Sequence, residues 1–191
     1  MAVLTPSPPP QATEAVQSIF RDAHHRALRS PALSKAAGPL QAVEPLQVFT
    51  LGLDDLLAKK DLQAAKSTGW IFLVHDGNQT LASAEAVPTG TGDEQVLSAL
   101  NEGRAVGSTA EAIRTVRGLP EVSKDDFELR LLRVPALYVT ALWLHKTAGT
   151  GDLVVPLAPS PVDAQIGQAA PASQLIDELR YKAGQANRAA P

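Results

Sequence analysis

The sequence predicts an α+β fold, with a mainly antiparallel sheet of about five to six strands and helices packed on it. Three observations support this prediction. Segments with apolar residues at helical spacing alternate with short apolar runs of strand length. Strong turn sequences join neighbouring strand candidates into hairpins, which pair antiparallel strands. The composition, 45% hydrophobic and 19% charged residues, is typical of a folded chain rather than a disordered one.

The first half of the chain begins with a helix and a strand. Apolar residues from Val16 to Ala27 recur on one face at helical spacing, Thr13 can cap this helix, and Ser30-Pro31 ends it. A short strand follows, and Asp54 then opens a second helix. The expected elements are a helix over residues 14–29, a strand over 46–51 and a helix over 54–66.

The next two segments read as a hairpin. Every residue from Trp70 to Val74 is apolar, as in a strand buried on both faces. Asp76-Gly77-Asn78 is strong turn chemistry, so the segment 80–87 is the expected antiparallel partner. Three alanines share one face of that partner and would let a helix approach closely: Ala82, Ala84 and Ala86.

Two helices are expected next, over residues 94–102 and 109–117. Ser108 and Glu111 form a capping box at the start of the second helix, while Gly118 and Pro120 end it. The last third reads as a meander with strands over 127–134, 136–145 and 153–157. Apolar alternation shifts by one residue within the first of these strands, which indicates a β-bulge.

The predicted domain organisation has four parts. Four prolines between Pro6 and Pro10 indicate a flexible tail over residues 1–11, followed by the α+β domain over 12–158. A Pro-rich linker over 159–172 leads to a final helix, with Ser173 as its cap and Gly184 as its stop, within a C-terminal part over 173–191. The strands around Trp70 and Trp143 are expected to form the buried middle of a single sheet.

Composition excludes several classes of function. The formal net charge is −3, so nucleic acid and anionic membranes are not the expected partners. The chain has no cysteine, which excludes disulfides, thiolate catalysis and cysteine metal sites. The N-terminus lacks the pattern of a signal peptide, and no apolar run is long enough to span a bilayer. A cytoplasmic, bacterial protein is therefore expected, with alanine and arginine usage as the hint of bacterial origin.

The tetrapeptide Gly-Thr-Gly-Asp occurs twice, at 90–93 and at 149–152. The first copy follows a strand and precedes an expected helix, as a dinucleotide-binding loop would. It lacks the third glycine, however, and Asp93 and Glu94 stand where a phosphate would bind. We therefore interpret the first copy as a turn with Asp93 as helix cap, and the recurrence as a chance feature of hairpin sequences. No cofactor is expected.

The candidate binding residues are His75, Asp76, Glu85 and His145. Each histidine ends a strongly apolar strand, where a rigid scaffold delivers side chains to solvent. If the two strands run parallel, both imidazoles emerge at one edge of the sheet. No third ligand at metal-binding spacing accompanies them, so no metal is expected.

Two charged groups have plain structural interpretations. His24, His25 and nearby arginines lie in the last turns of the first helix, where the helix dipole favours cations. Glu128, Arg130 and Arg133 share a strand; an anion-binding role is possible there, and a solvent-facing row of charges is the preferred interpretation. A nucleic-acid accessory protein would need a common surface formed by Arg21, Arg26, Arg29, Arg114 and Arg117.

By elimination, the sequence favours a non-enzymatic binding or assembly module that recognises a protein partner or a small ligand. A homo-oligomer is also expected, since the Pro-rich tail and the C-terminal helix are natural docking or swapping elements. The alternative is a hydrolase-like enzyme whose site is assembled from dispersed histidines and carboxylates, among them the four candidates above.

Overall fold

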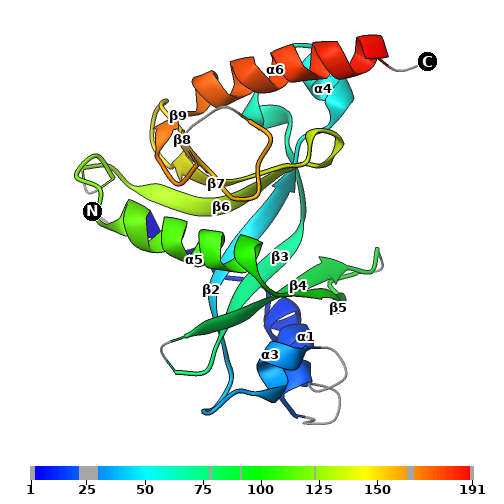
Figure 1. The fold of residues 1–191 in the computed structure, drawn as a ribbon, viewed down its shortest axis with the longest axis vertical. Coiled ribbons are helices and arrows are strands. Elements are labelled where there is room, and N and C mark those ends of the chain that lie inside the picture. The colour runs from blue at the N-terminus through cyan, green and yellow to red at the C-terminus, as the bar shows by residue number, and fades with distance from the viewer. Residues whose placement is uncertain are drawn as a thin grey trace. The chain divides into compact units, whose positions relative to one another are not determined.

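The computed structural model describes residues 3–21, 30–77, 79–90, 92–122, 124–162 and 166–189. Figure 1 shows its helices and strands, which confirm the α+β class. The helices are α1 (Pro10–Arg21), α3 (Pro31–Ser34), α4 (Leu53–Leu57), α5 (Arg104–Arg117) and α6 (Ala172–Ala189), with 3-10 helices η1 (Leu62–Ala64) and η2 (Pro135–Leu137). The strands are β1 (Val3–Leu4), β2 (Gln41–Thr50), β3 (Lys66–His75), β4 (Thr80–Pro88), β5 (Gln95–Asn101), β6 (Phe127–Val134), β7 (Val139–Lys146), β8 (Leu153–Pro156) and β9 (Ala170–Pro171).

The sheet is larger than expected and is mixed. Its nine strands follow the order β5-β4-β3-β2-β6-β7-β8-β9, with β1 paired to β6. Hairpin neighbours such as β3–β4 and β6–β7 are antiparallel, as expected, but β1 runs parallel to β6. The prediction of five to six strands missed β1 and β9, because two-residue strands leave no periodic signal. It also missed β5, which was expected to be a helix.

The chain divides into two compact units. Unit 1 comprises Met1–Leu4, Val48–Ser67 and Glu111–Pro191, and unit 2 comprises Thr5–Gln47 and Thr68–Ala110. Trp70 lies in the core of unit 2 and Trp143 in the core of unit 1. Both residues are in strands of the sheet, as expected, but the prediction that they share one buried centre is wrong.

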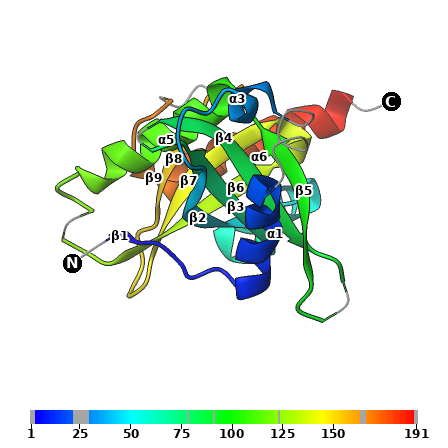
Figure 2. The ribbon, with the colours of Figure 1, turned by 90° about the horizontal axis from the view of Figure 1, so that it is seen from below.

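The core of unit 2 forms where α1 packs against β4 and β5, seen from below in Figure 2. Ala82, Ala84 and Ala86 are fully buried in it together with Val16 of α1. This confirms that the small residues of β4 let a helix approach closely. The same close packing shapes β3, because a side chain at Gly69 would meet the main-chain oxygen of Ala86 at 2.5 Å.

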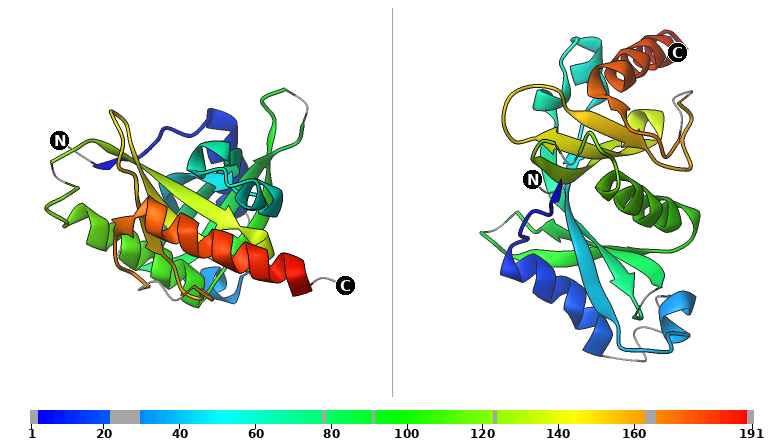
Figure 3. Two further views of the ribbon diagram at one scale, coloured as in Figure 1. Left: turned by 90° about the horizontal axis from the view of Figure 1, so that it is seen from above. Right: turned by 90° about the vertical axis from the view of Figure 1, so that its left-hand side faces the viewer.

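The core of unit 1 forms between the strands β6, β7 and β8 and the helices α4 and α6. Figure 3 shows α4 beside α6. From α6, the buried residues Leu175, Ile176 and Leu179 pack with Trp143 of β7 and Leu132 of β6. The helix is longer than expected and continues through Gly184, so the predicted stop there is wrong. Helix α6 is therefore a core element of unit 1.

Several element predictions are corrected by the structure. Residues 95–101 form strand β5 instead of a helix, because pairing with β4 outweighs a weak helical pattern. Helix α5 begins at Arg104, so Ser108 and Glu111 are not its cap, although its end at Arg117 before Gly118 is confirmed. The segment expected as one helix over 54–66 contains only α4 and η1, because the intervening Lys59 adopts a left-handed conformation with φ 59°.

The remaining corrections concern the pairing of β6 with β7 and the start of helix α1. Strands β6 and β7 pair in continuous register from Phe127↔Lys146 to Val134↔Val139, so the predicted bulge is wrong. The change in alternation arises because Leu131 and Leu132 are both buried, one on each face. Helix α1 begins at Pro10, where the fixed φ of proline suits the first turn. Whether the tail and the linker are flexible stays a prediction.

Candidate functional site: a pocket in unit 1

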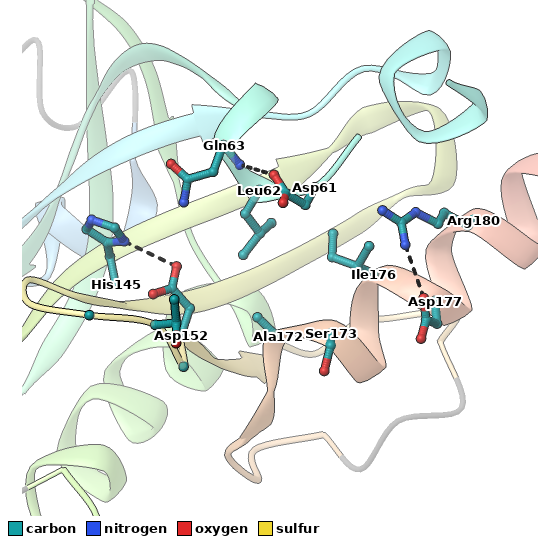
Figure 4. Close-up of a pocket in the computed structure, with 13 residues that line it drawn as sticks. Asp61, Leu62, Gln63, His145, Asp152, Ala172, Ser173, Ile176, Asp177 and Arg180 are labelled. Atoms are coloured by element: carbon teal, nitrogen blue, oxygen red, sulfur yellow. Dashed lines mark hydrogen bonds and ion pairs between the residues drawn. The ribbon is translucent and has the colours of Figure 1, made fainter. Parts of the chain in front are cut away.

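Unit 1 contains a pocket of about 380 Å³. Its walls come from three segments that are distant in the sequence: residues 61–63 at η1, the β7–β8 hairpin, and the first half of α6. Figure 4 shows the lining side chains, with Leu62 and Ile176 lying between the polar pair His145–Asp152 and the polar pair Asp177–Arg180. Asp61, Gln63 and Ser173 are exposed, so the pocket is open to solvent. The pocket thus has polar ends and an apolar middle.

Asp152 has three polar contacts at one end of the pocket. Its Oδ2 accepts hydrogen bonds from Trp143 Nε1 at 2.7 Å and contacts His145 Nδ1 at 3.1 Å, and its Oδ1 accepts from the main-chain N–H of Lys146 at 3.0 Å. The indole and the main-chain amide can only donate, so both oxygens of Asp152 act as acceptors. Its carboxylate therefore joins the core residue Trp143 to the pocket residue His145.

The β7–β8 hairpin delivers Asp152 to this position. Trp143 pairs with Val154 and Leu144 with Leu153, so Asp152 stands one residue before the paired segment. Gly149 and Gly151 adopt φ of 89° and 112°, which glycine reaches without steric cost. The second Gly-Thr-Gly-Asp sequence thus lies in the loop of a hairpin, and its aspartate accepts hydrogen bonds from the preceding strand.

His145 presents one edge of its ring to Asp152 and remains partly exposed. The side chains of His145 and Asp152 are 25% and 15% exposed. The imidazole also packs edge-on against Trp143, with ring centroids 5.5 Å apart. Within the described part of the chain, Nε2 of this ring makes no hydrogen bond. The ring is therefore held by Asp152 on one side, and its other nitrogen has no partner among the described residues.

The opposite end of the pocket is formed by α6 and the loop before η1. Arg180 donates through Nη2 to the main-chain oxygens of Lys59 at 2.9 Å and Lys60 at 3.1 Å, and through Nη1 to Asp177 at 3.2 Å. The guanidinium of Arg180 thus links helix α6 to the loop before η1. Asp61 accepts from the main-chain N–H of Gln63 at 2.9 Å, which caps η1.

An ion pair also fastens the loop before η1. Lys60 Nζ lies 2.8 Å from Asp55 Oδ1. This hydrogen bond lowers the pKa of the Asp55 carboxyl below its ordinary value, and the same contact raises the pKa of Lys60. Both side chains are solvated, so the pair makes only a small contribution to stability.

Arg130 packs differently from the solvent-facing row of charges expected on β6. Its guanidinium lies over the ring of Phe49 at 4.7 Å and over Trp143 at 4.9 Å, and it pairs with Glu128 at 2.6 Å. The side chain is only 18% exposed. Cation–π contacts therefore support the same tryptophan that donates to Asp152.

The structure places the four predicted candidates in different units. His145 lines the unit 1 pocket, whereas His75, Asp76 and Glu85 belong to unit 2. There, His75 Nε2 lies 2.8 Å from Thr80 Oγ1, and Asp76 accepts from the main-chain N–H of Ala37 at 3.2 Å. Glu85 faces Ile71 across the β3–β4 pair. In unit 2, these contacts hold hairpin and loop segments together.

Sequence reasoning missed Asp152 and Arg180 as pocket residues, and Trp143 as the core residue that donates to Asp152. The recurrence of Gly-Thr-Gly-Asp was the one signal available for Asp152. The first copy also lies in a hairpin, between β4 and β5, so the expectation of a helix capped by Asp93 is wrong. Trp143 and Arg180 carried no local signal, since their roles depend on partners distant in the chain.

Three further expectations concern the basic face of the first helix, metal binding and membrane-spanning helices. His24, His25, Arg26 and Arg29 lie outside the described residues, so the basic helix face stays untested. In the described part of the chain, no cluster of three or more histidines and carboxylates could hold a metal ion. Over the same residues, none of the helices combines the length and apolar character needed to cross a membrane.

Comparison with known proteins identifies no relative of this chain: no family model, curated protein or solved structure matches it.

Proposed function

We propose that this protein is a non-enzymatic binding module whose unit 1 pocket takes a small ligand with polar and apolar parts. The observation that supports this proposal is the pocket itself, which combines an apolar middle with polar pairs at both ends. Ligand sites commonly have this composition, with few polar groups placed to orient the bound molecule. The protein partner or homo-oligomer expected from the sequence stays a prediction.

The histidine contacts favour binding over catalysis. Nucleophilic hydrolysis needs a hydroxyl or thiol, a base and a group that orients the base. His145 has the orienting carboxylate of Asp152, and His75 has the hydroxyl of Thr80. Among the described residues, His145 therefore contacts an orienting carboxylate but no hydroxyl, and His75 contacts a hydroxyl but no carboxylate.

The experiment that tests the proposal is a ligand screen by NMR and thermal denaturation on the full chain. A set of small amphipathic molecules should include compounds that shift the resonances of His145 and Trp143 and raise the melting temperature. Gln63→Trp places bulk at the exposed rim of the pocket and should abolish these shifts. Gln17→Trp, at an exposed position of α1, is the matched control and should retain them. Equal binding by both variants would disprove the proposed site.

A hydrolytic function is the second candidate, and the His145–Asp152 pair is the observation in its favour. A base oriented by a carboxylate could activate water without a nucleophilic side chain. Release of nitrophenolate from a nitrophenyl ester would be measured for the native chain and for His145→Gln. Turnover that depends on His145 would replace the binding proposal with this one.

A further inference from the structure

We infer that Asp152 holds His145 in the tautomer that carries its proton on Nδ1, so that Nε2 accepts a hydrogen bond from the ligand, and that the ligand is a small organic ammonium ion. This inference rests on the proposed function, because it names the chemistry that the unit 1 pocket would recognise.

The tautomer follows from the donors around Asp152. Trp143 Nε1 and the main-chain N–H of Lys146 have no lone pair to offer, so both carboxylate oxygens already accept from obligatory donors. The carboxylate of Asp152 is therefore the acceptor of this cluster. Its contact with His145 Nδ1 at 3.1 Å is then attractive only if Nδ1 carries the proton. In the neutral ring, the lone pair is therefore on Nε2.

The charges of the pocket lining also favour an ammonium ion as the ligand. Asp61 and Asp177 line the pocket in addition to Asp152. The single guanidinium, Arg180, uses its terminal nitrogens on two main-chain oxygens and on Asp177. Nε of Arg180 is buried without a partner among the described residues, so the preference rests on charge: the lining carries three carboxylates against one guanidinium. A ligand that brings its own N–H groups and positive charge complements this lining.

The apolar middle defines the rest of the ligand. Leu62 and Ile176 lie between the two polar ends, and both are buried. A volume of about 380 Å³ accommodates one ring with a short substituent. The complementary molecule is thus a ring or short chain that carries an ammonium group.

The first measurement determines the tautomer without any ligand. Long-range ¹⁵N–¹H correlation spectra of the full chain at mildly alkaline pH, where an ordinary imidazole is neutral, should show a protonated Nδ1 and an unprotonated Nε2 for His145. Asp152→Asn should increase the population of the other tautomer, because an amide can donate to Nδ1. A native His145 with its proton on Nε2 would overturn the inference, whatever the pocket binds.

The second measurement uses three probes with the same ring: benzylamine, benzyl alcohol and benzoate. Benzylamine should bind with saturable shifts at His145, at least about tenfold more tightly than benzoate, because each carboxylate of the lining attracts the ammonium and repels the anion. Asp61→Asn retains the cap of η1 but removes a charge, and it should weaken benzylamine binding severalfold. Benzylamine binding by the Asp61→Asn variant therefore still tests the inference if the Asp152→Asn variant is unstable.

The outcomes separate this inference from the proposed function. Preferential binding of benzoate or benzyl alcohol would leave a ligand pocket in place and overturn the ammonium assignment. If none of the three probes binds, the ammonium assignment fails. The broader ligand screen with Gln63→Trp then decides the proposed function independently.

Discussion

Both units carry the tetrapeptide Gly-Thr-Gly-Asp between two antiparallel strands, and the copy in unit 1 lines a pocket. In unit 2, Gly-Thr-Gly-Asp closes the β4–β5 hairpin, and Asp93 is exposed beside the Thr89–Glu94 contact. In unit 1, it closes the β7–β8 hairpin, and Asp152 accepts hydrogen bonds from Trp143 and Lys146. The same loop sequence therefore has different contacts in the two units, because these contacts depend on what the flanking strands present to the loop.

The cores of the units differ in a related way. Unit 2 packs α1 onto the alanines of β4, so that helix and strand approach closely. Unit 1 packs α6 and α4 over Trp143, whose indole N–H needs an acceptor. Asp152 is that acceptor. The indole N–H of this core residue thus links the core of unit 1 to the partly buried pair His145–Asp152 at its pocket.

The largest expected effect tests the role of α6 in unit 1. Leu179 is fully buried against the core of this unit. Leu179→Ala should lower the free energy of unfolding by about 2–5 kcal/mol, because it removes buried methyl groups and leaves a cavity. Urea denaturation measures this loss. Gln174→Ala, at an exposed position of the same helix, is the control and should change stability by less than about 0.5 kcal/mol.

The next expected effect tests the close packing in unit 2. Gly69→Ala places a Cβ 2.5 Å from the main-chain oxygen of Ala86, so β3 and β4 must move apart. The free energy of unfolding should fall by about 1–3 kcal/mol. Gly149→Ala, whose Cβ would meet open space, should lose only about 1 kcal/mol through its positive φ. Equal losses in chemical denaturation would contradict the packing argument.

The comparison of the two hairpins is tested most directly by their aspartates. Asp152→Ala leaves the indole N–H of Trp143 without its acceptor and should cost about 1–3 kcal/mol. Asp93→Ala removes an exposed side chain and should stay within about 0.5 kcal/mol. Denaturation followed by tryptophan fluorescence measures both changes. A similar cost at the two positions would break the distinction between the hairpins.

The smallest expected effect concerns the ion pair before η1. Because the pKa of Asp55 is lowered in the folded protein, its contribution to stability is present above the unfolded-state pKa and is lost as pH falls through the folded-state value. The pKa of Lys60 is raised, so its contribution is lost as pH rises through the folded-state value. Lys60→Met should raise the Asp55 pKa in an NMR titration. An unchanged Asp55 titration would show that the pair does not persist in solution.

The sequence alone determined the elements whose signals are local. The apolar run from Trp70 to Val74 predicted a strand, Asp76-Gly77 predicted its hairpin, and Gly118 marked the end of α5. The alanines of β4 also predicted a closely packed helix. These features follow from backbone sterics and from hydrophobic periodicity, which act between neighbours in the chain.

Tertiary structure decided the rest. The segment 95–101 became a strand because β4 offered it hydrogen-bonding partners, and α6 passed Gly184 because the core of unit 1 holds the helix. The polar cluster joins Trp143, His145 and Asp152 only after a hairpin has paired their strands. Sequence patterns record which faces are apolar, but hydrogen bonds between distant side chains depend on register and packing, which form only as the chain folds.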